Sequence, residues 1–315
     1  MATIRAVVAD PALPERLALR EVDAPSPLPT EALVRVHAIS LNRGEVRNAM
    51  NATTVTRPGW DVAGVVEQAA ADGSGPRQGA RVVGFLNTGG WAELVAVPTH
   101  ALAELPESVS FAQASTLPIA GLTALYALEK GGGLLEQPVL VTGASGGVGL
   151  FAVQLARLMG AKVVGAFRNA NYEEPVRELG AHEVVIGDDL APARAFGPYH
   201  LILESVGGAS LGTALTLLAP GGMCVLFGVS AGGDASFSPG AFFRTGGTSL
   251  YGFLIFDEVK RHPAGQGLAR LVRLIDEKRL HPRIEVEAPW TDIAEVARQL
   301  MDRRYPGKAV LAVTE

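Results

Sequence analysis

The residues best suited to chemistry lie in one glycine-rich stretch, residues 139–149, which read VLVTGASGGVG. An apolar run typical of a strand enters a turn of small residues, and an amphipathic helical pattern follows. Glycines let a backbone approach a pyrophosphate closely, and a helix N-terminus offers unpaired N–H groups with the positive end of the helix dipole. The stretch predicts a dinucleotide-binding loop, although a tight turn without a ligand is the alternative. The expected cofactor-binding residues of this loop are Gly143, Ala144, Ser145, Gly146, Gly147 and Val148.

The strand that follows this helix indicates which nucleotide is bound. An NAD-binding fold usually ends that strand with an acidic residue that holds the ribose 2′-hydroxyl. Here the strand ends in Arg168 and Asn169, and no acid occurs before Glu173. A guanidinium can pair with a 2′-phosphate, so the sequence favours NADP(H), bound by Arg168 and Asn169. A solvated surface charge is the alternative reading of Arg168.

The elements that must position these residues change in type along the chain. Residues 1–109 contain many short alternating stretches separated by Gly and Pro, which is typical of a β-rich barrel or sandwich. Ser110 and Gln113 have the spacing of a helix capping box, and Pro118 should break or kink the helix that they begin. Strands and helices then alternate. The βαβα order predicts an α/β fold with a parallel, doubly wound sheet of the Rossmann type.

Composition excludes several classes of protein. The chain has 315 residues, of which 48% are hydrophobic and 19% charged, so it can bury a large core. A net charge of −5 argues against nucleic acid as the main partner. Its single cysteine, Cys224, excludes an intrachain disulfide, lies in a strand-like run and is expected to be buried.

The sequence shows no sign of a membrane protein. No segment approaches 18 apolar residues without a charge or a breaker, and the N-terminus does not have the pattern of a signal peptide. We therefore expect a cytoplasmic protein.

Several segments together resemble one known family. They are residues 40–42 (SLN), 59–64 (GWDVAG), 79–84 (GARVVG), 117–124 (LPIAGLTA), 143–149, 179–181 (LGA), 204–207 (ESVG) and 306–308 (PGK). Each is weak alone, but their order and spacing resemble the medium-chain dehydrogenase/reductase superfamily, in its zinc-independent quinone oxidoreductase branch. This resemblance implies a GroES-like catalytic domain with an inserted Rossmann domain. The expected domains are residues 1–115 plus 255–315, and residues 116–254.

The resemblance also implies roles for individual residues. Asn42 and Thr123 match positions that approach the nicotinamide and the substrate in this family. Relatives often carry a tyrosine proton donor where this chain has Arg47, and a guanidinium stays protonated at pH 7. Arg47 can still bind a carbonyl oxygen or an anion. The expected catalytic residues are Asn42, Arg47 and Thr123; their alternatives are a turn residue, an exposed helix charge and a helix-interior threonine.

Ligands of doubly wound sheets bind outside the carboxyl ends of the strands. The resemblance places further residues at such ends beside the cofactor, although strand-end packing is the alternative. They are Val206, Phe227, Gly228, Val229, Phe253 and Leu254, with residues 253–256 expected to end the last strand.

These features together suggest an NADPH-dependent oxidoreductase that transfers hydride to a quinone or an α,β-unsaturated carbonyl, and that forms a homodimer. Two alternatives remain open: a trans-acting enoyl thioester reductase and a non-catalytic NADPH-binding sensor.

The resemblance generates a prediction about metals. Zinc-dependent relatives carry a cysteine in the segment equivalent to residues 38–42 and a Gly-His-Glu at the position of residues 59–61, which here read Gly-Trp-Asp. Activity should therefore survive dialysis against a chelator. Elemental analysis that finds one zinc per chain, together with loss of turnover on chelation, would contradict this expectation.

Overall fold

A computed structural model describes residues 2–313, which form two compact units. The first unit lies within Met1–Leu122 and Val259–Glu315, and the second is Thr123–Glu258. The first unit is therefore built from both ends of the chain. The domain limits expected from the sequence, residues 1–115 plus 255–315 and residues 116–254, remain a prediction.

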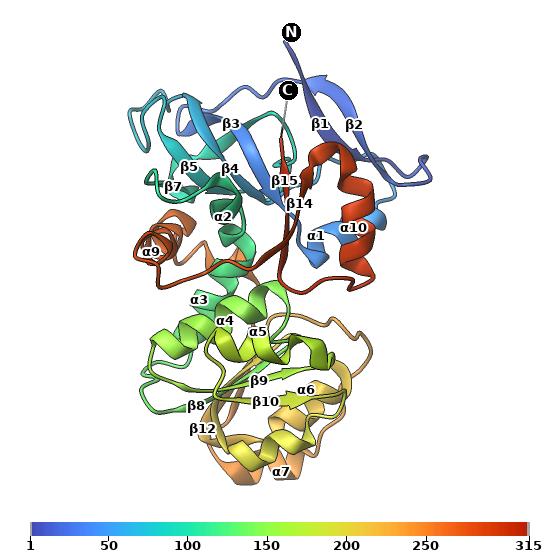
Figure 1. Ribbon diagram of the computed structural model, residues 1–315, viewed down its shortest axis with the longest axis vertical. Coiled ribbons are helices and arrows are strands. Elements are labelled where there is room, and N and C mark those ends of the chain that lie inside the picture. The colour runs from blue at the N-terminus through green and yellow to red at the C-terminus, as the bar shows by residue number, and fades with distance from the viewer. Residues whose placement is uncertain (1, 314–315) are drawn as a thin grey trace. The chain divides into compact units, whose positions relative to one another are not determined.

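The first unit is rich in β-structure (Figure 1). Its seven-stranded sheet has the order β14-β15-β3-β4-β5-β7, with β6 paired to β3, and β1 and β2 form a separate antiparallel pair. Its strands are β1 (Thr3–Ala9), β2 (Leu17–Asp23), β3 (Glu31–Ser40), β4 (Asp61–Gln68), β5 (Arg81–Phe85), β6 (Leu94–Pro98), β7 (Leu102–Glu104), β14 (Ile284–Pro289) and β15 (Lys308–Ala312). The C-terminal strand β15 pairs with β3, so the short tail completes the N-terminal sheet.

The helices of the first unit pack beside this sheet. They are α1 (Arg43–Met50), α2 (Phe111–Ser115), the π-helical segment η2 (Leu117–Gly121), α9 (Ala264–Asp276) and α10 (Ile293–Met301), with single turns at Thr99–Ala101 and Trp290–Asp292. The capping box is confirmed, because the Gln113 N–H donates to Ser110 Oγ at 3.1 Å and the Ser110 N–H donates to Gln113 Oε1 at 3.1 Å. The break at Pro118 is confirmed too, since regular helix stops at Ser115 and resumes only in α3 (Leu122–Glu129).

The second unit confirms the predicted doubly wound sheet. Its six strands have the order β10-β9-β8-β11-β12-β13, and all neighbouring pairs are parallel. The strands are β8 (Pro138–Thr142), β9 (Lys162–Phe167), β10 (Glu183–Ile186), β11 (Tyr199–Glu204), β12 (Leu218–Leu226) and β13 (Ser249–Gly252).

Helices cover both faces of this sheet. Helices α4 (Gly147–Leu158) and α5 (Glu173–Glu178) lie on one face and α6 (Gly208–Leu215) lies on the other, as Figure 1 shows. Helices α7 (Pro239–Thr245) and α8 (Ile255–Glu258) follow later, and single turns occur at Ala170–Tyr172 and Ala191–Phe196. A buried apolar cluster that includes Leu140, Ile202 and Cys224 fills the space between the sheet and its helices, and Cys224 is a free thiol.

One expectation about local structure is wrong. The last parallel strand ends at Gly252, so residues 253–256 do not end it; the chain turns there into α8. Residues 43–50 form a helix that buries Glu45, Val46 and Ala49 on one face. Strand β12 begins at Leu218, which pairs with Tyr199 of β11 before an irregularity in the register.

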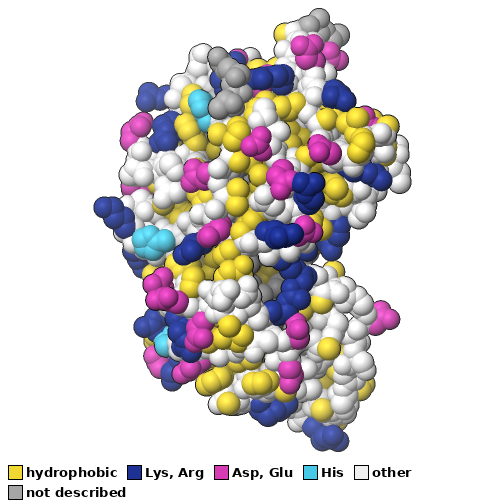
Figure 2. Space-filling model, turned by 45° about the vertical axis from the view of Figure 1, so that its right-hand side comes forward, with side chains coloured by type: hydrophobic (Ala, Val, Ile, Leu, Met, Phe, Trp, Pro, Cys, Tyr) yellow, Lys and Arg dark blue, Asp and Glu magenta, His cyan; other side chains and the backbone are white. Residues whose placement is uncertain are grey.

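No helix within residues 2–313 is long and apolar enough to cross a membrane. On the face shown in Figure 2, acidic and basic side chains are interspersed rather than gathered by sign.

Candidate functional site

The parallel sheet brings most of the predicted cofactor residues to one edge. Because all six strands run in the same direction, their carboxyl ends share that edge. The loops that leave β8, β9, β11, β12 and β13 there carry, respectively, residues 143–146, Arg168 with Asn169, Val206, residues 227–229, and Phe253 with Leu254. Segments far apart in the sequence thus meet along one line of strand ends.

The strand order reverses between β8 and β11, which are neighbours although β9 and β10 separate them in the sequence. Ligands of open α/β sheets bind at such a switch point. The two strand ends are joined here by side chains: the Ser205 N–H donates to Thr142 Oγ1 at 2.9 Å, and Ser205 Oγ donates to the Thr142 carbonyl at 3.0 Å. These hydrogen bonds fix the two strand ends at the switch point relative to each other, next to the glycine-rich loop.

The glycine-rich loop can exist only with glycine at its key positions. Gly143 has φ +63°, a conformation that L side chains rarely adopt. A Cβ on Gly149 would lie 2.2 Å from the Gly143 carbonyl oxygen, so the loop closes directly onto the first turn of α4. The N-cap residue of α4, Gly146, provides no side-chain hydrogen bond. The N–H groups of the first turn are therefore available to an external acceptor, which suits a phosphate.

Glu204 is a residue of this site that the sequence reasoning missed. Its side chain is fully buried at the end of β11. The carboxylate accepts hydrogen bonds from Thr142 Oγ1 (3.1 Å), the Gly207 N–H (2.9 Å) and Ser210 Oγ (2.8 Å). Burial raises the pKa of Glu204, and these hydrogen bonds to the charged form oppose the rise. The carboxylate thus fixes the turn after β11 against the end of β8.

Arg168 and Asn169 follow β9, as predicted. Asn169 Oδ1 accepts the Asn171 N–H at 3.0 Å and so begins a helical turn. The Arg168 side chain is 54% exposed, and its Nε lies 3.7 Å from Asp188 Oδ1 on the loop after β10. A basic group is therefore held at the strand end where an NAD-binding fold usually has an acidic one.

The remaining strand ends present small or apolar groups. A Cβ on Gly228 would lie 3.0 Å from the Ser205 carbonyl oxygen, so the loop after β12 crosses the end of β11 closely. Val229 and Leu254 expose 47% and 59% of their surface, whereas Phe253 is buried. Exposed apolar side chains beside a polar loop are typical of a ligand-binding crevice.

In the first unit, the predicted catalytic residues Asn42 and Arg47 belong to α1. Asn42 is the N-cap of this helix, and its N–H donates to Glu45 Oε2 at 3.2 Å. Arg47 lies one turn further along and is exposed. The Arg47 guanidinium forms no hydrogen bond or ion pair with another residue of 2–313.

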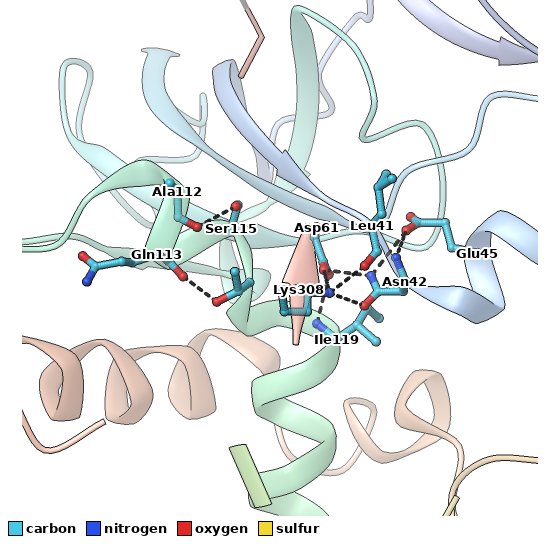
Figure 3. Close-up of polar contacts among 10 residues, drawn as sticks. Leu41, Asn42, Glu45, Asp61, Ala112, Gln113, Ser115, Ile119 and Lys308 are labelled. Carbon is cyan, nitrogen blue, oxygen red and sulfur yellow. Dashed lines mark hydrogen bonds and ion pairs between the residues drawn. The ribbon is translucent and has the colours of Figure 1, made fainter. Parts of the chain in front are cut away.

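A buried polar cluster surrounds the start of α1 (Figure 3). Lys308, at the start of β15, donates from Nζ to the Leu41 carbonyl at 2.8 Å and to Asn42 Oδ1 at 2.6 Å, and it forms an ion pair with Asp61 at 3.5 Å. The other carboxylate oxygen of Asp61 accepts the Ile119 N–H, from the π-helical segment, at 3.0 Å. The ammonium and both carboxyl groups, Asp61 and Glu45, are buried.

The side-chain amide of Asn42 is fully occupied by this cluster. Its Nδ2 donates to Asp61 Oδ2 at 2.8 Å and to Glu45 Oε2 at 3.3 Å, and its Oδ1 accepts from Lys308. An amide has two N–H donors. Asn42 therefore has no N–H left for a substrate, and its structural task is to orient α1 relative to β4 and β15.

Burial decides the ionisation of the cluster. It raises the pKa of Glu45 well above 4.5, and the neighbouring charge of Asp61 raises the pKa further. Burial also raises the pKa of Asp61 and lowers that of Lys308, because a charge loses its hydration there. Asp61 has the ammonium, the Ile119 N–H and the Asn42 amide as partners, whereas Glu45 Oε1 has none. Asp61 thus has more partners that favour its charged form than Glu45, whose pKa is raised well above 4.5 mainly by burial.

Thr123, the third predicted catalytic residue, lies in α3 and is buried. It belongs to the second unit, whereas Asn42 and Arg47 belong to the first. Sequence reasoning missed Lys308 and Asp61 as members of a polar cluster. Each lies within one of the family segments, and nothing in the sequence around Lys308 indicates that its ammonium is buried.

No group of three or more His, Cys, Asp or Glu side chains within the described part of the chain is arranged to hold a metal ion.

Comparison with known proteins connects both units to one family. Residues 28–107 match the alcohol dehydrogenase GroES-like domain, and residues 147–271 match the zinc-binding dehydrogenase domain. A quinone oxidoreductase from Pongo abelii is 33% identical over 231 residues, which cover 68% of this chain and 70% of that protein.

Two further relatives have larger overlaps with this chain. The spectinabilin polyketide synthase system protein NorB from Streptomyces orinoci is 33% identical over 92% of this chain, which corresponds to 14% of that much longer protein. A mycobacterial protein solved as a complex with NADPH has a TM-score of 0.88 at 23% identity, with 98% of this chain and all 100% of that chain covered. This last likeness concerns the fold.

The raised pKa of Glu45 generates a prediction about stability. An acid whose pKa is raised by folding stabilises the fold below its unfolded pKa, near 4.5, and this contribution is lost as pH rises through the folded pKa. Glu45→Gln, which mimics the protonated acid, should therefore raise the free energy of unfolding at pH 8 by about 1–3 kcal/mol. It should also flatten the fall in stability above pH 5. Urea unfolding at several pH values measures both effects.

Glu107→Gln is the matched control, because the Glu107 side chain is 95% exposed. Its unfolding free energy should change by no more than about 0.5 kcal/mol. A Glu45→Gln protein that is less stable than the parent at pH 8, with an unchanged pH slope, would show that Glu45 is ionised in the fold.

Proposed function

The chain belongs to the medium-chain dehydrogenase/reductase superfamily, in its quinone oxidoreductase branch, and it is therefore an oxidoreductase. On this premise we propose that it uses NADPH to reduce quinones or α,β-unsaturated carbonyl compounds. The observation that carries the proposal is the glycine-rich loop at the switch point of the parallel sheet. Bound there, NADPH supplies a hydride from its nicotinamide ring.

The residues of the second unit fit such a cofactor. The loop of residues 143–146 and the first turn of α4 bind the pyrophosphate through backbone N–H groups, since Gly146 offers no side chain that would cap them. Arg168 binds the 2′-phosphate, and Asn169 lies beside it. The apolar side chains of Val229 and Leu254, with Val206, Phe227 and Phe253, line the edge further along the sheet. A mycobacterial protein of the same fold has been solved with NADPH, which supports this assignment.

The proposal for the substrate concerns the residues of the first unit. Reduction of an enone or a quinone at carbon leaves negative charge on the carbonyl oxygen. Preorganised donors aimed at such developing charge stabilise it. Because the Asn42 donors are already used, the Arg47 guanidinium, which is exposed and unpaired within residues 2–313, is the better candidate donor. A guanidinium is a poor acid, so water protonates the oxyanion afterwards.

An enoyl thioester is the second candidate acceptor. NorB, which belongs to a polyketide synthase system, is 33% identical over nearly the whole chain. Reduction of an enoyl thioester uses the same chemistry on a conjugated double bond. The two classes of acceptor require the same donors and differ only in the pocket that receives them.

The proposal includes a cytoplasmic homodimer. Strand β13 is the last strand at one side of the parallel sheet, and Leu250 on it exposes 43% of its surface. An open strand edge with an apolar side chain is a natural place for a second copy to pair.

The first prediction concerns the cofactor. The native protein should bind NADPH more tightly than NADH in a calorimetric titration, and it should oxidise NADPH in a screen of quinones, enones and enoyl thioesters. Arg168→Ala should weaken NADPH binding by about 1–3 kcal/mol, the scale of one charged hydrogen-bond partner, and leave NADH binding nearly unchanged. Tighter binding of NADH to the native protein would overturn the cofactor assignment, and binding without oxidation of any acceptor would favour a sensor.

The second prediction concerns the substrate. Arg47→Ala should lower kcat/KM roughly tenfold to a thousandfold and leave NADPH affinity intact, because only the charge that develops on the substrate loses its donor. Arg47→Lys should recover part of the activity, since an ammonium cannot reproduce a planar fork. Asn48→Ala alters the adjacent exposed residue of α1 and is the control. Rates for Arg47→Ala within about twofold of the parent would make Arg47 an ordinary surface charge.

A further inference from the structure

Arg168 has a partner that the sequence pattern did not indicate. Strands β9 and β10 are parallel, with Phe167 opposite Ile186, and the Gly187 N–H donates to the Phe167 carbonyl at 3.0 Å. This hydrogen bond ties the end of β10 to the end of β9, so the two loops leave the sheet together. The Asp188 carboxylate thereby lies 3.7 Å from the Arg168 guanidinium.

This ion pair contributes little to folding. The Arg168 and Asp188 side chains are 54% and 87% exposed, and solvent screens such pairs strongly. Within residues 2–313, Asp188 is the one carboxylate that forms an ion pair with Arg168. The pair is exposed to solvent at the carboxyl-end edge of the parallel sheet. The Asp188 carboxylate can therefore affect the affinity for a ligand that Arg168 binds.

We propose that Asp188 sets the selectivity between NADPH and NADH by competing with the 2′-phosphate for Arg168. The inference rests on the proposed function, because it takes the loop after β9 as the nucleotide ribose site. Its new element is that an acidic residue acts at this site from the neighbouring strand, although β9 itself ends without one.

The physical argument has two parts. A 2′-phosphate bound to Arg168 brings nearly two negative charges next to the Asp188 carboxylate, which repels the phosphate and shares the positive charge of the same guanidinium. A ribose without the phosphate meets the opposite situation, since a carboxylate accepts hydrogen bonds from hydroxyl groups. Asp188 therefore weakens NADPH binding and assists NADH binding. It reduces the preference for NADPH over NADH that Arg168 creates.

The adjacent residue offers a matched control. Asp189 has the same charge one position further along, but its Oδ1 accepts the Ala191 N–H at 2.8 Å in a turn. It forms no ion pair with Arg168. Asparagine preserves an acceptor oxygen at either position, so Asp188→Asn and Asp189→Asn remove equal charge from neighbouring sites.

The test measures binding by the purified full-length native protein and by both variants. Four probes are titrated by calorimetry: NADPH, NADH, adenosine 2′,5′-bisphosphate and AMP. The two adenosine probes isolate the 2′-phosphate from the nicotinamide. Asp188→Asn should tighten NADPH and adenosine 2′,5′-bisphosphate by about threefold to tenfold, the size of one screened charge interaction, and should leave AMP within about twofold. NADH should bind equally well or more weakly.

Asp189→Asn should change the ratio of NADH to NADPH dissociation constants by less than about twofold. The increase in NADPH affinity caused by Asp188→Asn should be smaller at high salt, because the Arg168 and Asp188 charges are both exposed. Equal ratios for the two variants, or weaker NADPH binding by Asp188→Asn, would overturn the inference while leaving the cofactor site intact. A native protein that binds neither dinucleotide would instead overturn the proposed function.

Discussion

All six strands of the second unit run in one direction, and this single constraint decides where its chemistry can occur. Parallel strands place every carboxyl end at the same edge, so loops that are distant in the sequence become neighbours. At the reversal between β8 and β11 the two adjacent connections leave in opposite directions, which is where ligands of open α/β sheets bind. The hydrogen bonds between Thr142 and Ser205 and the network around Glu204 hold these two strand ends together.

The close approach within the glycine-rich loop is a consequence of the same geometry. Helix α4 must start immediately after β8 to cover the sheet, and this brings the Gly143 carbonyl oxygen against Gly149. Only residues without a side chain permit that contact, and the same residues leave backbone N–H groups open to an anion. The packing of the helix on the sheet and the capacity to bind phosphate thus have one structural cause.

The first unit is organised around a different constraint, the burial of the Lys308 ammonium. A desolvated charge is tolerated only with partners, and those partners are Leu41 and Asn42, between β3 and α1, and Asp61 of β4. Through Asp61 the cluster also holds the π-helical segment that contains Pro118. The helix that carries Arg47 is therefore fixed from its first residue, while Arg47 itself remains free at the surface. The Asn42 side-chain amide forms its hydrogen bonds within this internal network.

The sequence alone determined the alternation of strands and helices, the glycine-rich loop, the capping box at Ser110 and the break at Pro118. Those features depend on local chemistry: side-chain periodicity, the absence of a Cβ and the missing N–H of proline. Only the tertiary structure decided which polar groups meet. Lys308 and Asp61 are far apart in the chain, and Arg168 and Asp188 lie on separate strands, so neither contact has a local signal. The buried face of α1 has no local signal either, because it includes Glu45, whose burial depends on the neighbouring strands.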